Sequence, residues 1–301
     1  MTIENKECNT FREALDLLLK ISEDTNYVFR GQPDYINHRI SSTLYRHIPI
    51  KYVGDFTFDR LLNYFIASVA KIGELPFKIT ERMSWMEYGQ HHGLPTPCID
   101  FTYSVFNALF FAFDGINQLD KNDRAIYALN YRSLGEYYFK NYGNNDPVVR
   151  DTFWRSPVEK TIKDHTAKPL IEGGVPLHGF FEHEGRFPTN KLQFIPFPKY
   201  NNQRMIRQQG CFVYDTIVYR DSDPVHDFES LIENVDENSN LGNGPTAYKI
   251  RMKNEFAKEV FTLLDKMNIN NAMLYLDPNG SARDIKNSYY YNPKSLSVRD
   301  S

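Results

Sequence analysis

Residues 27–31 read Tyr-Val-Phe-Arg-Gly, a short run of β-prone side chains that ends at a glycine. Such a run predicts a strand. Alternation along the strand places Tyr27 and Phe29 on one face and Val28 and Arg30 on the other. The guanidinium of an arginine offers a rigid fork of donors that suits a carboxylate or a phosphate. We therefore expect Arg30 either to bind a ligand or to pair with a structural carboxylate.

Apolar side chains elsewhere recur with the spacing of helices or with the alternation of strands. They predict helices at about 10–20, 56–72, 84–93, 103–114, 201–209, 254–267 and 271–276. They predict further strands at about 125–131, 192–197, 211–219 and 246–252. Because these elements are mixed without regular βαβ alternation, we expect an α+β fold with a mixed or mainly antiparallel sheet flanked by helices.

No internal repeat or linker divides the chain, so we expect residues 1–301 to form one domain with a core at about 20–287. Residues 132–190 are irregular and contain several prolines, which predicts an insertion, and the polar residues 236–245 predict a loop. The polar tail after Ser288 is expected to fray. Residue types that cap helices predict three helix starts, at Thr10 with Glu13, at Ser84 with Glu87, and at Asp100 or Thr102.

Composition limits the classes of function. The chain has 301 residues, 41% of them hydrophobic, which is enough for a full core, and a net charge of −3 with both signs interspersed. This balance disfavours nucleic acid as a partner, although a local basic cleft could still exist. The N-terminus lacks the pattern of a secretory signal, and the longest apolar stretch is far shorter than a membrane span of roughly 20 residues. Three widely spaced cysteines predict free thiols and a cytoplasmic location: Cys8, Cys98 and Cys211.

Residues 90–102 read Gln-His-His-Gly-Leu-Pro-Thr-Pro-Cys-Ile-Asp-Phe-Thr. Adjacent histidines on a helix project about 100° apart, so His91 and His92 would make a poor metal site, and we expect no metal. One of them could contact a ligand or transfer a proton, and the alternative is a histidine bonded to the backbone beside a solvated one. Cys98 resembles a nucleophile but has no obvious group to orient it.

Residues 202–212 form a third candidate segment. Arg204 and Gln208 lie four residues apart, hence on one helical face, and could grip a polar ligand near Gly210. The alternative is a solvated amphipathic helix. The chain has no P-loop, no dinucleotide-binding glycine motif, no nucleophile elbow and no H-E-x-x-H, which disfavours the enzyme classes that depend on them.

These segments together resemble the FRG family. Its [FY]-R-G motif is matched at 29–31 and is followed by Leu-Tyr-Arg at 44–46. Residues 90–102 resemble its Q-H-x-G-L-P-T-R-L-L-D-W-T segment, residues 204–212 its R-x-x-x-Q-x-G-x-F segment and 274–280 its L-F-P-D-L-D-G ending. The chain departs from the pattern at Pro97 and Cys98, where the family has Arg-Leu. If that arginine holds an anion in relatives, this chain has lost it.

A fainter resemblance, in motif order, is to ADP-ribosyltransferases. These enzymes carry an early arginine, a small polar motif and a late acidic or amide residue, an order followed by Arg30, Thr96 and Gln208 or Gln209. The resemblance implies NAD as substrate, with Arg30 on its pyrophosphate. It implies catalytic roles for His91, Asp100 and Gln208 and cofactor contacts from Arg30, Gly31, Gln32, Thr96 and Arg204. Because a glutamine cannot accept a proton as a glutamate does, Asp100 or a histidine would have to replace it.

Two interpretations therefore stay open. One is an NAD-consuming transferase or glycohydrolase that serves as a toxin or phage-defence effector. The other is a non-catalytic module that holds a nucleotide or a protein partner in the same cleft. Both require Arg30, His91, Asp100 and Gln208 to converge in one pocket.

Overall fold

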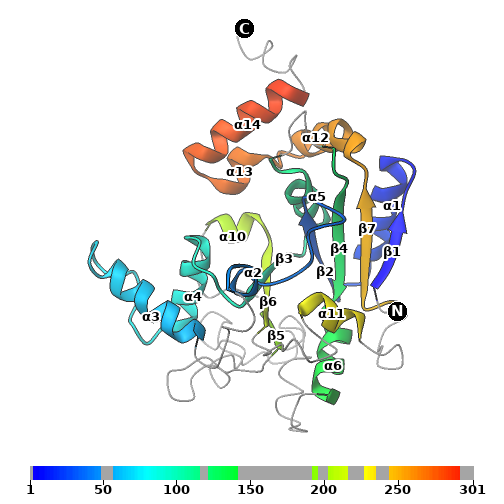
Figure 1. The fold of residues 1–301 in the computed structure, drawn as a ribbon. Coiled ribbons are helices and arrows are strands. Elements are labelled where there is room, and N and C mark those ends of the chain that lie inside the picture. The colour runs from blue at the N-terminus through cyan, green and yellow to red at the C-terminus, as the bar shows by residue number, and fades with distance from the viewer. Residues whose placement is uncertain are drawn as a thin grey trace, which may run out of the picture.

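In a computed structural model, the described residues are 3–48, 57–115, 121–141, 192–195, 203–215, 227–234 and 244–291. They form a seven-stranded sheet in the order β1-β7-β4-β2-β3-β6-β5 (Figure 1). The strands are β1 (Ile3–Glu7), β2 (Tyr27–Gln32), β3 (Cys98–Thr102), β4 (Arg124–Asn130), β5 (Leu192–Ile195), β6 (Gly210–Asp215) and β7 (Ala247–Met252). Only β1 and β7 pair in parallel among these strands. The predicted α+β class with a mixed sheet is confirmed.

Helices cover both faces of the sheet (Figure 1). One face packs against α1 (Phe11–Ser22), α5 (Val105–Phe113), the short helix η4 (Asn254–Phe256) and α12 (Ala257–Lys266). The other carries α6 (Tyr131–Asn141) and α11 (Phe228–Glu233). A third cluster joins β3 and β6 to α2 (Thr43–His47), α3 (Thr57–Val69) and α4 (Arg82–His91). The remaining helices are α10 (Gln203–Arg207), α13 (Asn271–Tyr275) and α14 (Pro278–Tyr291).

The alternation expected along β2 is confirmed. Tyr27 and Phe29 lie in the core beneath α1 and α5. Val28 lies in the core of the opposite face, so Arg30 projects to that second side. The strand thus supplies both halves of the core and carries one arginine out of it.

The sheet separates beside Arg30. β2 pairs with β4 at six positions, from Tyr27 to Gln32. It pairs with β3 at one position only, Phe29 with Thr102. Past that pair the two strands no longer share a ladder, so the polar edges of β2 and β3 face each other across a gap. Such backbone groups need other partners, because an unpaired buried group is costly.

Helix α5 lies directly against β2. A Cβ built on Gly31 would lie 2.2 Å from the carbonyl oxygen of Ala108 and 2.4 Å from the amide nitrogen of Ala112. Real Cβ atoms do not approach backbone so closely. Because Gly31 has no side chain, it admits the backbone of α5.

The helix caps follow the sequence only in part. Thr10 Oγ1 accepts a hydrogen bond from the amide of Glu13 (3.2 Å), so the predicted N-cap is confirmed. The Glu13 carboxylate accepts from the amide of Asn9 (2.9 Å) and not from that of Thr10, so the reciprocal bond of a capping box is shifted by one residue. The prediction at Ser84 is wrong, because α4 begins at Arg82 and buries both Ser84 and Glu87.

The cap predicted for the apolar helix is also wrong. Asp100 and Thr102 belong to β3, a strand that the sequence analysis missed, and Ser104 caps α5 through the amide of Asn107 (3.2 Å). Other missed elements are β1, α2, α6, α11 and α14. Helix α6 occupies the start of the predicted insertion.

Several predictions lie outside the described residues: residues 142–190 of the predicted insertion, the loop at 236–243, the tail beyond Tyr291, and the distal ends of the two strands predicted at 192–197 and 211–219. Within the described part of the chain, no helix combines the length and hydropathy that crossing a membrane requires.

We predict that Gly31→Ala destabilises the fold strongly. The new methyl group would meet the backbone of α5, which cannot move aside without disturbing the core, so we expect a loss of about 2–3 kcal/mol in the free energy of unfolding. Urea denaturation measures it. Gly73→Ala is the matched control, because a Cβ there meets no atom within 4 Å. Equal stabilities of the two variants would contradict the close approach of α5 to β2.

Candidate functional site

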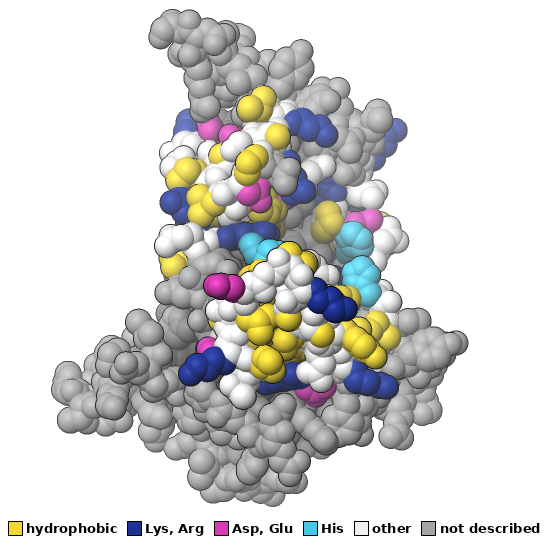
Figure 2. Space-filling model, turned by 90° about the vertical axis from the view of Figure 1, so that its left-hand side faces the viewer, with side chains coloured by type: hydrophobic (Ala, Val, Ile, Leu, Met, Phe, Trp, Pro, Cys, Tyr) yellow, Lys and Arg dark blue, Asp and Glu magenta, His cyan; other side chains and the backbone are white. Residues whose placement is uncertain are grey.

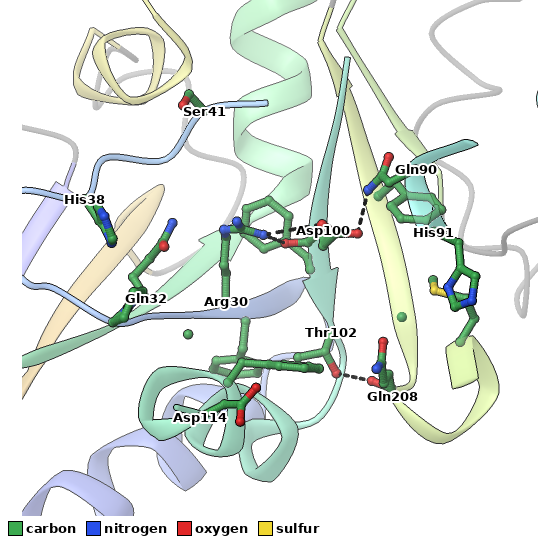
Figure 3. A pocket seen from close by; sticks show the side chains of 18 of the residues that line it. Arg30, Gln32, His38, Ser41, Gln90, His91, Asp100, Thr102, Asp114 and Gln208 are labelled. Atoms are coloured by element: carbon green, nitrogen blue, oxygen red, sulfur yellow. Dashed lines mark hydrogen bonds and ion pairs between the residues drawn. The ribbon is translucent and has the colours of Figure 1, made fainter. Parts of the chain in front are cut away.

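A cavity of about 750 Å³ opens where β2 and β3 separate (Figure 3). This volume lies within the roughly 300–1,000 Å³ of small-molecule sites. Its wall comes from β2, β3, α2, α4, α10, α13 and the end of α5. Seven of the residues singled out from the sequence line it: Arg30, Gly31, Gln32, His91, Asp100, Arg204 and Gln208. The structure thus brings together the residues whose convergence both functional interpretations require.

Arg30 bridges the gap between the separated strands. Its Nη1 donates a hydrogen bond to the backbone carbonyl of Asp100 (2.6 Å) and lies 3.9 Å from Oδ2 of the same residue. The Arg30 side chain is 14% exposed, whereas that of Asp100 is 56% exposed. Burial lowers the pKa of Arg30, Asp100 opposes that shift, and an arginine stays charged at neutral pH regardless. The expected structural pairing is therefore present, although its short contact is to a carbonyl.

A second guanidinium faces the same carboxylate. Arg46, on α2, lines the cavity and donates to the carbonyl of Ser41 (3.2 Å). Burial lowers the pKa of Arg46, and Asp100 raises it. The charge of Arg46 also lowers the pKa of Arg30. Two cations that share one carboxylate leave a local positive charge that favours an anionic ligand.

A third arginine, Arg39, differs from Arg30 and Arg46 because several carboxylates lie around it. It also lines the cavity, but three carboxylates of the α11 segment surround it at 3.4–3.6 Å: Asp227, Glu229 and Glu233. Its charge is therefore matched within the protein.

Two donors at the cavity have no partner among the described residues. They are Nε of Arg30 and Nε2 of Gln32, and Gln32 is only 5% exposed. Alternation along β2 puts the two side chains on the same face of the strand. A buried donor that lacks a hydrogen-bond partner costs about 1–3 kcal/mol of stability. Both are donors, so the group that would satisfy them is a hydrogen-bond acceptor.

Thr96 does not line the cavity. Its side chain is fully buried, and Oγ1 donates to Oε1 of Gln90 (2.5 Å). Gln90 in turn donates through Nε2 to Oδ1 of Asp100 (2.6 Å; Figure 3). Thr96, expected to contact the cofactor, instead supports Gln90 from behind. Gln90 itself was not assigned a role from the sequence, although it opens the motif at 90–102.

The two histidines have different surroundings. His91 lines the cavity, whereas the ring of His92 packs on Tyr88 with centroids 4.3 Å apart. Burial lowers the pKa of His91, as do Arg204 and His92, and Asp277 raises it. These surroundings favour the neutral form of His91, which can accept a proton. Histidine and basic side chains gather beside a hollow in the face that carries α3 and α4 (Figure 2). No cluster suited to a metal ion occurs within the described ranges.

The turn from α10 into β6 completes the wall. Gln208 is buried, its Nε2 donates to the carbonyl of Leu274 (3.4 Å), and its own carbonyl accepts from Thr102 Oγ1 (2.7 Å). Arg204 places its guanidinium over the ring of Tyr275, 4.6 Å from the centroid. Gln209, the alternative late residue, does not line the cavity. Its φ of 47° forms the turn, and its carbonyl accepts from the amide of Tyr103 (3.1 Å).

Two acidic residues that line the cavity were not assigned to the site from the sequence. Glu87 lies one helical turn before His91 on α4, a spacing that could have revealed it. Asp114, at the end of α5, accepts from the hydroxyl of Tyr275 (2.6 Å) and lies 3.6 Å from Nη1 of Arg283. No local pattern marks Asp114, because its partners come from the far end of the chain.

Cys98 is excluded as a nucleophile. Its side chain is buried, it does not line the cavity, and burial raises the pKa of its thiol well above the ordinary value. The sulfur lies 3.7 Å from that of Met86, in the core. A reactive cysteine needs an exposed and electropositive setting.

Comparison with known protein families identifies an FRG domain at residues 25–121. This confirms the family resemblance over β2, α2, α3, α4, β3 and α5, the segments that carry Arg30, His91 and Asp100. The motifs noted near 204–212 and 274–280 lie outside the matched stretch. Neither the curated proteins nor the solved structures contain a match to the chain.

We predict that His91 titrates below its ordinary pKa of 6.5, because burial and the nearby Arg204 disfavour the imidazolium. Proton NMR of the histidine ring signals over pH 4–8 measures it, and the signal missing from His91→Gln assigns the resonance. Arg204→Gln should move the midpoint upward, since it removes a positive neighbour. A midpoint at or above 6.5 in the wild-type protein would contradict the described setting of His91.

Proposed function

With an FRG domain at residues 25–121, we propose that the cavity binds NAD and that the protein cleaves it, as an ADP-ribosyltransferase-like enzyme or an NAD glycohydrolase. One observation carries the proposal: Arg30, His91, Asp100 and Gln208, from four separate elements or turns, line one cavity of nucleotide-binding size. The order of these residues along the chain is the order seen in ADP-ribosyltransferases.

The phosphates of NAD would bind at the positive end of the cavity. Arg30 and Arg46 share the single carboxylate of Asp100, and the unpartnered donors of Arg30 and Gln32 project from the same strand. A diphosphate supplies the negative charge and the acceptor oxygens that this group lacks. Gly31 packs closely on α5, and this contact fixes the positions of Arg30 and Gln32 relative to that helix.

The bases of NAD would bind against aromatic surface. Two aromatic residues that line the cavity, Phe111 and Tyr275, are only partly buried. Aromatic rings stack on nucleobases and on nicotinamide with favourable energies. Arg204, held over Tyr275, adds a further cation at this end.

In the proposed reaction, the bond between ribose C1′ and the nicotinamide nitrogen breaks, and the electron pair leaves with neutral nicotinamide. The carboxylate of Asp100 stabilises the positive charge that develops on the ribose. Water, or a hydroxyl group of an acceptor, attacks C1′ and gives its proton to neutral His91. Gln208 orients a ribose hydroxyl through its amide and takes no proton.

A non-catalytic nucleotide-binding module is the second candidate. It is favoured by the engagement of Asp100, whose carboxylate already accepts from Gln90 and lies near Arg30, and by the lack of a proton acceptor at Gln208. For either candidate we propose a cytoplasmic location, because the three cysteines are free and buried and suit a reducing compartment. A toxin or phage-defence role belongs to the first candidate.

We predict that the wild-type protein binds NAD and releases nicotinamide, and that Arg30→Ala binds NAD about 10- to 100-fold more weakly. The loss follows from removing charge-assisted hydrogen bonds to phosphate, which contribute about 1.5–3 kcal/mol. Calorimetry measures binding, and chromatography measures nicotinamide. Arg12→Ala, which removes the same charge from a side chain that is 91% exposed on α1, is the control.

The outcomes separate the candidates. Binding without nicotinamide release supports the nucleotide-binding module. No binding at millimolar NAD, or equal binding by wild type and Arg30→Ala, refutes the NAD proposal.

A further inference from the structure

A chain of hydrogen bonds links α2 to Arg30 through Thr96, Gln90 and Asp100. Thr43 Oγ1 accepts from the amide of Thr96 (2.9 Å) and donates to the carbonyl of the same residue (3.1 Å). The amide of Leu44 donates to that carbonyl as well (3.0 Å). The backbone of Thr96 is therefore fixed on both sides by α2, and its hydroxyl has a defined position.

The orientation of the next member is determined by chemistry. The hydroxyl of Thr96 donates to Oε1 of Gln90, and Nε2 of Gln90 donates to Oδ1 of Asp100. A carboxylate can only accept, so the amide nitrogen has to face Asp100 and the amide oxygen has to face Thr96. The reversed amide would set an oxygen against the carboxylate. Gln90 thus has one orientation that satisfies both neighbours.

The end of the chain meets Arg30. Oδ1 of Asp100 is taken by Gln90, Oδ2 lies 3.9 Å from Nη1 of Arg30, and the Asp100 carbonyl accepts the short bond from that nitrogen. The Asp100 side chain is 56% exposed, and an exposed carboxylate at the distance limit of an ion pair is weakly held by the pair alone. The bond from Gln90 is the additional restraint.

We propose that Gln90 is a positioning residue. Supported by Thr96, it holds the Asp100 carboxylate at the orientation that faces the cavity and Arg30, and so sets the geometry in which the ribose charge is stabilised. The catalytic part of this inference rests on the proposed NAD reaction. The hydrogen-bonded restraint itself does not.

The charged groups around the restraint come from three elements. Arg30 on β2 and Arg46 on α2 face Asp100, and His91 follows Gln90 on α4. The two arginines attract a carboxylate placed at position 90, whereas Asp100, in direct contact, repels it. Because Nε2 of Gln90 lies only 2.6 Å from Oδ1 of Asp100, the repulsion by Asp100 is larger than the attraction by the arginines.

The test uses Gln90→Glu, which keeps the shape of the side chain. In its neutral form the new carboxyl group accepts from Thr96 and donates to Asp100, as the amide does. In its ionised form it repels Asp100. The folded-state pKa of the new group is therefore raised above the ordinary glutamate value of about 4.3. Its stabilising contribution is present below that value and is lost as pH rises through the raised folded-state pKa.

We predict that the melting temperature of Gln90→Glu lies close to that of the wild type near pH 4 and falls below it by on the order of 3 °C at pH 8. Gln203→Glu, at an exposed position on α10, is the matched control and should differ little from the wild type at either pH. If the melting temperatures of Gln90→Glu and the wild type differ by the same amount at both pH values, the proposed restraint of Asp100 by Gln90 is refuted.

Turnover distinguishes positioning from a purely structural role. We expect kcat for NAD in Gln90→Glu to fall about tenfold or more between pH 5 and pH 8 relative to the wild type, with a smaller change in KM. Gln90→Leu should lose kcat at both pH values. Wild-type kcat in both variants would overturn the positioning role. Absence of NAD turnover in the wild type would instead refute the proposed function, while the melting measurement still decides the restraint.

Discussion

The separation of β2 from β3 after a single residue pair is the constraint on which the site depends. This separation exposes the polar edges of two central strands. The side chain of Arg30 extends across the gap and donates a hydrogen bond to the carbonyl of Asp100. Because α5 lies directly against Gly31, the strand cannot shift to close the gap from the other side. The cavity is therefore a consequence of sheet topology, and its floor is as rigid as the core beneath it.

Charge in the cavity is distributed unevenly for a physical reason. Arg39 is matched by carboxylates of α11, whereas Arg30 and Arg46 divide one exposed carboxylate between them. Arg30 lies where β2 and β3 separate, whereas the side chain of Arg39 is 48% exposed. A ligand that carries negative charge would thus be drawn toward the gap, where the unpartnered donors of β2 lie.

The sequence predicted the class of the fold, and most of the residues that it singled out line one cavity, because both depend on local patterns. Alternation along β2 placed Arg30 correctly, and the spacing of Arg204 and Gln208 placed both at the cavity. Strand β3 was missed because it is central and buried on both faces apart from Asp100, so no alternation shows, and β1 because an edge strand with one buried residue resembles a loop. Thr96 and Asp114 depend on partners distant in sequence, which no local pattern contains.

The parallel pairing of β1 with β7 joins Ile3 to Ala247, the most distant segments of the sheet. Contacts of such sequence separation form late, because a long loop has to close before they are gained. During synthesis, β1 can pair only after β7, which ends at Met252, has emerged, and β7 has to insert between β1 and β4. Until then the edge of β4 is open to pairing with other chains, so early release from the ribosome, or a tag that holds the N-terminal strand away, would favour aggregation over folding.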